Sequence, residues 1–188
     1  MKKKIRDALY PAIFVIIFIT IYGIRSLGTL ITFGSSMALA YLFYMLTNYK
    51  EMPEPERTLP VYLIALGVQL LHFIEEFTTG LYIRFPTEIY NSDPYSANEF
   101  VISQMVVYFL FIIGALGIFK GWNMTMIFVW FLLIMMLIVN SIQHPIYSIM
   151  VGGYFPGLYT SFAGIILAPI LFKRLWEVRD KFSNNLTS

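Results

Sequence analysis

The sequence predicts an all-α fold: a polytopic membrane helical bundle of about six transmembrane helices, with both termini cytoplasmic. The first observation is composition, because 58% of the 188 residues are hydrophobic and only 13% are charged. Soluble domains carry about a quarter charged residues and less than half apolar ones. The second observation is that the apolar residues fall into separate runs of membrane-spanning length. We find no internal repeat or linker, so residues 1–188 are expected to form a single transmembrane domain.

The first two helices are predicted over 8–25 and 27–48, turning near the glycines at 23 and 28. A basic head followed by an apolar run resembles a secretory signal, and Ala38-Leu39-Ala40 resembles a cleavage site. The second apolar run directly follows the first, however, and together they are far longer than a signal sequence. We therefore expect both runs to be retained as membrane helices.

The rest of the chain predicts four more helices. Residues 48–60 are polar and contain three prolines, which predicts a loop. Residues 80–99 form the longest polar segment and predict an external loop or a short interfacial helix. Pro145 is expected to end the fifth helix at its histidine, because a residue before proline is pushed out of the α region. The four predicted helices are Val61–Thr79, Phe100–Phe119, Met124–His144 and Gly157–Phe172, with a polar tail from Lys173 to Ser188.

The distribution of Lys and Arg predicts the orientation. Eleven of the 13 lie in the head, the 48–60 loop, the turn at 120–123 and the tail, and only Arg25 and Arg84 lie in the alternate segments. Cytoplasmic segments of membrane proteins are enriched in these residues. The sequence therefore predicts an integral, multi-pass protein of the cell membrane with both termini inside. Because membrane orientation accounts for the basic segments, no nucleic-acid partner is expected.

Two stretches place ionisable groups inside apolar runs, which is costly and marks candidate functional residues. His72-Phe-Ile-Glu75-Glu76 ends the third helix, and Asn140-Ser-Ile-Gln-His144 ends the fifth; they contain the only two histidines. The predicted topology puts both stretches at one depth, near the outer leaflet. The same level is expected to hold Glu99, Ser103, Gln104, Tyr108 and the turn Tyr154–Gly157.

Two histidines with carboxylates form a donor set suited to a divalent metal, zinc first, with iron or manganese as alternatives. The chain has no cysteine, so any metal must use nitrogen and oxygen ligands. We predict His72, Glu76 and His144 as ligands, because the i,i+4 spacing of His72 and Glu76 is the one used by zinc-binding helices. Glu75 is then predicted as the general base. The i,i+3 spacing of di-iron bundles would exchange the two glutamates.

These residues resemble the motifs of the HXXEE-domain family of membrane proteins. His72–Glu76 matches HxxEE, Asn140–His144 matches NxxxH, and Tyr154–Gly157 matches YxPG, all in the family's order. The resemblance covers about residues 60–172. It implies a multi-helix membrane protein that is suspected to be a metal-dependent enzyme.

The function expected from these residues is a membrane-embedded, metal-dependent hydrolase acting on a lipid or small amphipathic substrate at the outer leaflet. Asn140 would orient a ligand or substrate oxygen, and the turn that contains Tyr154 would form a lip or lid. The expected partners are membrane lipids and that substrate; the oligomeric state stays open. Three alternatives remain: a structural hydrogen-bond network, a proton- or ion-coupled transporter with these groups as a relay, and a metal-independent hydrolase using the paired glutamates.

Overall fold

The computed structural model describes residues 2–25 and 27–187, and in this part of the chain it contains helices and turns but no strand. Five helices are long and apolar enough to cross a membrane, and Leu30–Leu46 forms a shorter apolar helix. The predicted all-α polytopic bundle is therefore confirmed, with the second of the six predicted helices shorter than the others. The five long spans are Ile5–Ile24, Pro55–Thr78, Ala97–Lys120, Asn123–Met150 and Leu158–Val178.

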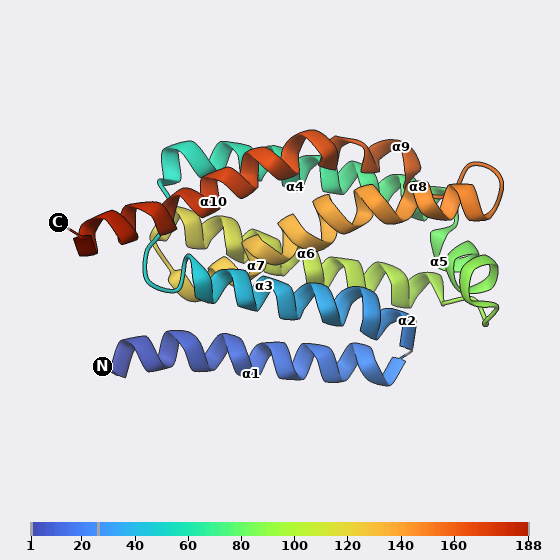
Figure 1. Ribbon diagram of the computed structural model, residues 1–188. Coiled ribbons are helices and arrows are strands. Elements are labelled where there is room, and N and C mark those ends of the chain that lie inside the picture. Colours follow the sequence, from blue (N-terminus) through green and yellow to red (C-terminus); the bar gives the residue numbers. More distant parts are fainter. Residues whose placement is uncertain (1, 26, 188) are drawn as a thin grey trace.

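The helices run up and down in one elongated bundle, and the two chain ends lie at the same end of it (Figure 1). This end also holds the connections from α3 to α4 and from α6 to α7, whereas α5 and the turn between α8 and α9 lie at the opposite end. The arrangement agrees with the alternation predicted from the charges; which end faces the cytoplasm stays a prediction. The helices are α1 (Lys2–Arg25), α2 (Leu27–Thr29), η1 (Leu30–Gly34), α3 (Ser35–Leu46), α4 (Pro55–Thr78), α5 (Leu81–Arg84), η2 (Phe85–Ile89), α6 (Ala97–Lys120), η3 (Asn123–Thr125), α7 (Met126–Phe131), η4 (Leu132–Val139), α8 (Asn140–Met150), α9 (Leu158–Ser161) and α10 (Ala163–Thr187).

The core of the bundle is the continuous helix made by α7, η4 and α8. Two thirds of the residues in its most apolar stretch are buried, against less than a third in each of the other four spans. Every residue of η4 from Leu132 to Leu137 is buried, and this π-helical stretch packs against α3 and α10. A helix that is apolar all round belongs inside a bundle. The polar end of this central helix therefore carries His144 into the interior.

The helix does not end at His144, so that prediction is wrong: α8 continues through Pro145 to Met150. Proline lacks an N–H group, and its ring crowds the carbonyl of Ser141, four residues earlier. Membrane helices tolerate this where hydroxyl groups, neighbouring helices and local π-helical turns satisfy the freed groups. Here η4 directly precedes α8, and Ser141 Oγ lies 2.5 and 2.6 Å from the carbonyl oxygens of Leu137 and Ser161.

Two further boundaries differ from the prediction. The 48–60 loop is shorter than predicted, because α4 begins at Pro55. Proline is favoured in the first turn of a helix, where no N–H group is needed. The predicted polar tail is helical to Thr187 as part of α10, whose residues Leu175 and Val178 are buried in a helix packed on α4. This apolar stripe extends the helix beyond the run visible in the sequence.

The orientation can be tested with single cysteines, because the chain has none of its own. Ser92 and Glu54 are exposed. Ser92 lies in the connection from η2 to α6 and Glu54 in the connection from α3 to α4, and these connections lie at opposite ends of the bundle. We predict that Ser92→Cys reacts with a membrane-impermeant thiol reagent in intact cells, and that Glu54→Cys reacts only after lysis. Labelling of Glu54→Cys in intact cells would show that the charge-based orientation is inverted.

Candidate metal centre

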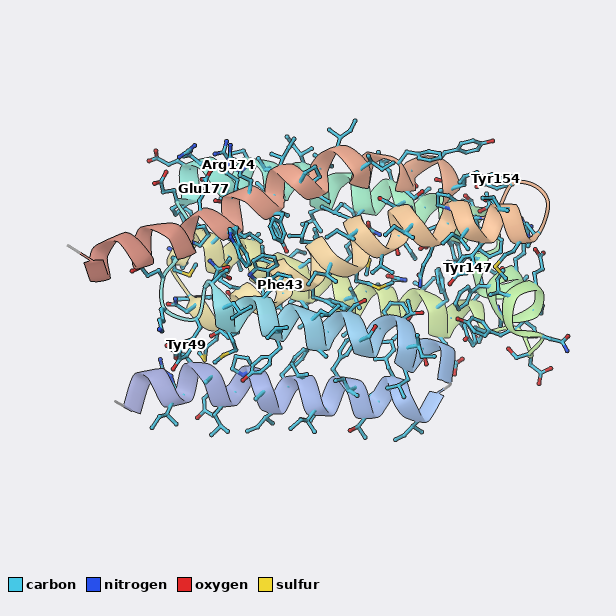
Figure 2. All side chains as sticks on the ribbon, in the orientation of Figure 1. Phe43, Tyr49, Tyr147, Tyr154, Arg174 and Glu177 are labelled. Atoms are coloured by element: carbon cyan, nitrogen blue, oxygen red, sulfur yellow. The ribbon has the colours of Figure 1, made fainter. Side chains whose placement is uncertain are left out.

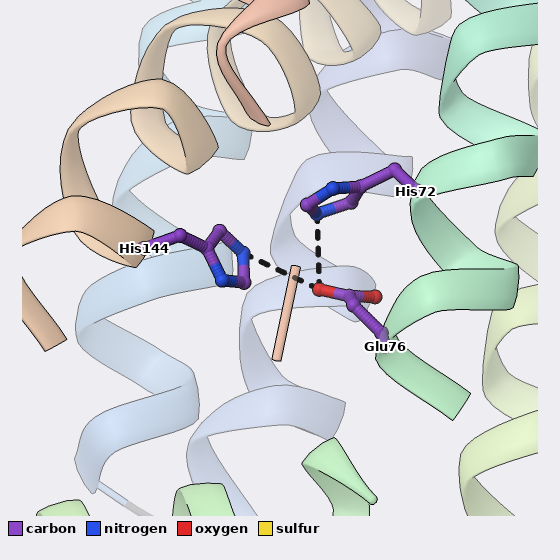
Figure 3. A group of neighbouring side chains, drawn as sticks. All are labelled: His72, Glu76 and His144. Atoms are coloured by element: carbon purple, nitrogen blue, oxygen red, sulfur yellow. Dashed lines mark ion pairs between the residues drawn. The ribbon is translucent and has the colours of Figure 1, made fainter. Parts of the chain in front are cut away.

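Three buried side chains from two helices meet near the end of the bundle opposite the termini. His72 and Glu76 are one turn apart on α4, and His144 faces them from α8 (Figure 3). One carboxylate oxygen, Glu76 Oε1, lies 3.1 Å from His72 Nε2 and 3.4 Å from His144 Nε2. The three possible ligand atoms all lie within 4.8 Å of one another. This group could therefore hold a metal ion.

The second nitrogen of each histidine ring shows which tautomer is present. His144 Nδ1 lies 2.6 Å from the carbonyl oxygen of Pro156, which only accepts, so Nδ1 must carry the proton. His72 Nδ1 lies 2.7 Å from Thr160 Oγ1. Thr160 donates its own hydroxyl proton to Glu75 Oε2 over 2.5 Å, so its oxygen accepts from His72. In the neutral form of both rings, Nε2 therefore presents a lone pair to Glu76.

His144 Nε2 and Glu76 Oε1 repel each other at this distance unless a positive charge lies between them. A metal ion or protons could supply that charge. The lone pair of His72 Nε2 also has the Asn140 amide as a possible donor. Four ligands at 2.0–2.1 Å in a tetrahedron are separated by about 3.3 Å, the spacing of the histidine–Glu76 contacts. A histidine whose other nitrogen donates to a carbonyl or hydroxyl group is also the usual metal-ligand arrangement. Asn140 lies at the same place, with Nδ2 3.0 Å from His72 Nε2.

Glu75 points to a different place from Glu76. Its carboxylate accepts hydrogen bonds from the Tyr154 hydroxyl at 2.8 Å, the Tyr159 N–H at 3.1 Å and the Thr160 N–H at 2.9 Å, besides the Thr160 hydroxyl. The predicted base thus anchors the segment from 154 to 160 and reaches His72 through Thr160. Sequence reasoning missed Thr160, which lies outside the three motifs.

Tyr154 belongs to this anchor, and its placement at the end of the bundle opposite the termini is visible in Figure 2. Burial raises the pKa of its hydroxyl, and the hydrogen bond to Glu75 raises it further, so the group remains a donor. The backbone carbonyl of Tyr154 accepts from Arg84 at 3.1 Å. Arg84 also binds Glu88 through two contacts of 2.6 and 2.8 Å, which lower the pKa of Glu88. The turn is therefore held from both sides.

Two features of the structure require a glycine at position 157, where the turn ends. Its φ of 85° lies in the left-handed region, which residues other than glycine rarely adopt. A Cβ atom here would lie 2.5 Å from His144 Cε1 and 2.8 Å from His72 Cε1. The backbone of the turn therefore packs directly on both histidine rings.

A cavity of about 600 Å³ reaches the group from one side and is lined by Glu76, Asn140 and His144. Glu99, Ser103 and Gln104 of α6 also line it. The structure thus brings these predicted polar residues to the wall of one cavity. Tyr108 instead donates to the Gln69 carbonyl of α4, an interhelical hydrogen bond of the structural kind.

The fold and this group define the chain as a helical membrane protein with a candidate metal centre between two of its spans. The chain belongs to the family described as "protein of unknown function with HXXEE motif", whose sequence profile matches residues 63–172. The predicted family resemblance is therefore confirmed. No curated protein and no solved structure matches the chain.

The packing of Gly157 yields a mutational prediction with an internal control. Gly157→Ala should displace both histidine rings and lower the free energy of unfolding by about 2 kcal/mol or more, from strain and overpacking. Gly153→Ala should have little effect, because its Cβ would meet no atom within 4 Å. Thermal unfolding of the two variants in mild detergent measures the difference. Equal stability would show that the turn does not pack on the histidines.

Proposed function

We propose that this protein is a membrane-embedded, metal-dependent hydrolase whose metal is held by His72, Glu76 and His144. The observation that carries the proposal is the convergence of two Nε2 lone pairs on one oxygen of Glu76, with both Nδ1 protons already bound elsewhere. Catalytic zinc sites have three protein ligands and keep one position for water or substrate, whereas structural sites have four protein ligands. The cavity that reaches Glu76 and His144 supports the catalytic type.

When bound, the metal would lower the pKa of a water molecule and polarise a substrate carbonyl. The residues around it have separate roles. The Asn140 amide, beside His72 and lining the cavity, would orient a substrate oxygen. Oε1 of Glu76 makes both histidine contacts, which leaves Oε2 to take up a proton from the attacking water.

Glu75 is better suited to positioning than to the base role predicted from the sequence. Both of its carboxylate oxygens already accept hydrogen bonds from the 154–160 segment. Through Thr160 it holds the Nδ1 proton on His72, which keeps Nε2 available for a metal. Mutation of a carboxylate that orients a metal-bound histidine in this way typically lowers metal affinity 10–100-fold.

Of the alternatives, transport needs polar groups that continue along the bundle. The central helix beyond Asn140 is formed by η4, whose eight residues are all apolar. A relay from His144 would therefore have no next partner on this helix. The structural network and the metal-independent hydrolase both lack a bound metal, so metal analysis separates them from the proposal.

The proposal predicts about one metal ion per chain in protein purified in mild detergent. His144→Ala should remove most of it, because the group then has two ligands. Gln143→Ala is the matched control: it lines the same cavity beside His144 but offers no ligand of this set, and it should retain the metal. Elemental analysis of the three proteins gives the result. Wild type free of metal, with a thermal stability that chelators leave unchanged, would support the structural network instead.

Replacing each glutamate separates the two roles. Glu76→Gln should lose most of the metal, because a neutral amide is a poor ligand. Glu75→Gln should keep at least part of it and lower the free energy of unfolding by about 1–3 kcal/mol, because its NH₂ group would face N–H donors of the turn. Metal content and thermal unfolding are measured on both. Full metal occupancy in Glu76→Gln together with complete loss in Glu75→Gln would exchange the assignments.

A further inference from the structure

The cavity beside the metal group has a polar end and an apolar end. Glu76, Asn140, Gln143 and His144 line it next to the metal group. Its remaining wall is mostly aromatic and aliphatic and comes from α1, η1, α5, η2, α6 and η4. Tyr147, labelled in Figure 2, belongs to this lining and continues the wall beyond His144 on α8. A site of this shape fits a molecule with one polar end and one long apolar part.

The cavity opens sideways, between α1 and α6. Ile17 and Ile21 of α1 line it and are each 53% exposed, while Ile102 and Val106 of α6 line it and are 62% and 56% exposed. All four lie inside membrane-spanning segments. Over its length α1 packs on η1 and α3 rather than on α6. The opening therefore faces the hydrocarbon region of the bilayer, from which a lipid chain could enter.

The size of the cavity limits what can enter. At about 30 Å³ for a water-sized group, 600 Å³ holds about 20 non-hydrogen atoms. One alkyl chain with a small head fits this space, whereas a phospholipid with two chains does not. The occupant is therefore a single-chain amphiphile.

The charges of the lining limit the head group. Glu76 and Glu99 are the acidic groups of the lining, and Ser103, Gln104, Asn140 and Gln143 add neutral donors and acceptors. Among the described residues that line the cavity there is no Lys or Arg. A phosphate or sulfate would be buried there beside carboxylates without a protein cation, which is unfavourable. An uncharged head with a carbonyl group matches the amide donors.

We infer that this cavity binds the chain of a neutral, single-chain fatty ester or amide, which enters from the membrane between α1 and α6 and presents its carbonyl to the metal group. The ester or amide linkage rests on the proposed hydrolase function; the chain site rests on the cavity alone. Hydrolysis would break the acyl C–O or C–N bond, add the water hydroxyl to the acyl carbon and pass a proton to the leaving oxygen or nitrogen. No other reactant is required.

Photolabelling tests the chain site without any need for turnover. The probe is a neutral alcohol of about 16 carbons with a diazirine in its chain, which is within the capacity of the cavity. It is added to the protein in neutral detergent, and the labelled residues are located by mass spectrometry. We expect labels on cavity-lining residues of α1 and α6. Val106→Trp, which places a large ring at the opening, should reduce this labelling about tenfold, consistent with overpacking.

Met105→Trp is the matched control. Met105 is the neighbouring residue, is 65% exposed and does not line the cavity, so this variant should label like wild type. A monoacylglycerol should compete with the probe, whereas an anionic lysophospholipid and a two-chain phospholipid should compete weakly. Equal labelling of the two variants, or labels confined to lipid-facing residues outside the cavity, would overturn the chain site. Strong competition by the anionic lipid would overturn the neutral head group.

The same samples separate this inference from the proposed function. Labelling of the cavity in a wild-type protein that contains no metal would leave the chain site standing and refute the hydrolase. Metal bound by His72, Glu76 and His144 without labelling of the cavity would refute the chain site and leave the proposed hydrolase standing.

Discussion

The contact of Glu76 Oε1 with the Nε2 atoms of His72 and His144 is the interaction on which the half of the bundle opposite the termini depends. A carboxylate buried among membrane helices needs a positive charge beside it, and the penalty for leaving one uncompensated is about 3–5 kcal/mol. Among the described residues, only the two histidines form ion pairs with this carboxylate. A metal ion shared by the three groups would compensate the charge without protonating either ring. The same contact ties α4 to α8, the peripheral helix to the central one.

The turn from Tyr154 to Thr160 makes this arrangement specific. It supplies the Pro156 carbonyl to one histidine and the Thr160 hydroxyl to the other, and Gly157 packs on both rings. Glu75 holds the turn in place through both of its carboxylate oxygens. The three sequence motifs thus form one physical unit together with Thr160. Two of them provide the converging groups. The turn motif fixes the tautomer of His144 through Pro156, and Thr160, which follows that motif, fixes the tautomer of His72.

The helical pattern and the donor set could be predicted from the sequence because they follow from local rules. Apolar runs give the spans, and the i,i+4 spacing places His72 and Glu76 on one face. That spacing alone does not tell what Glu75 contacts, since the answer depends on a turn about 80 residues later in the chain. The continuation of α8 through Pro145 likewise depends on η4 and on tertiary contacts of Ser141. The cavity could not be predicted at all, because it is formed between α1 and α6, which share no sequence pattern.

X-ray absorption spectroscopy of the purified protein, loaded with the metal that it retains best, tests the central claim most directly. The account predicts a first shell of two imidazole nitrogens and carboxylate or water oxygens, at about 2.0–2.2 Å for zinc. In His144→Ala, the metal that can still be loaded should show about half the multiple-scattering signal of imidazole per metal ion. A shell made only of oxygen atoms, or one that His144→Ala leaves unchanged, would contradict the assignment of His72, Glu76 and His144 as the metal centre.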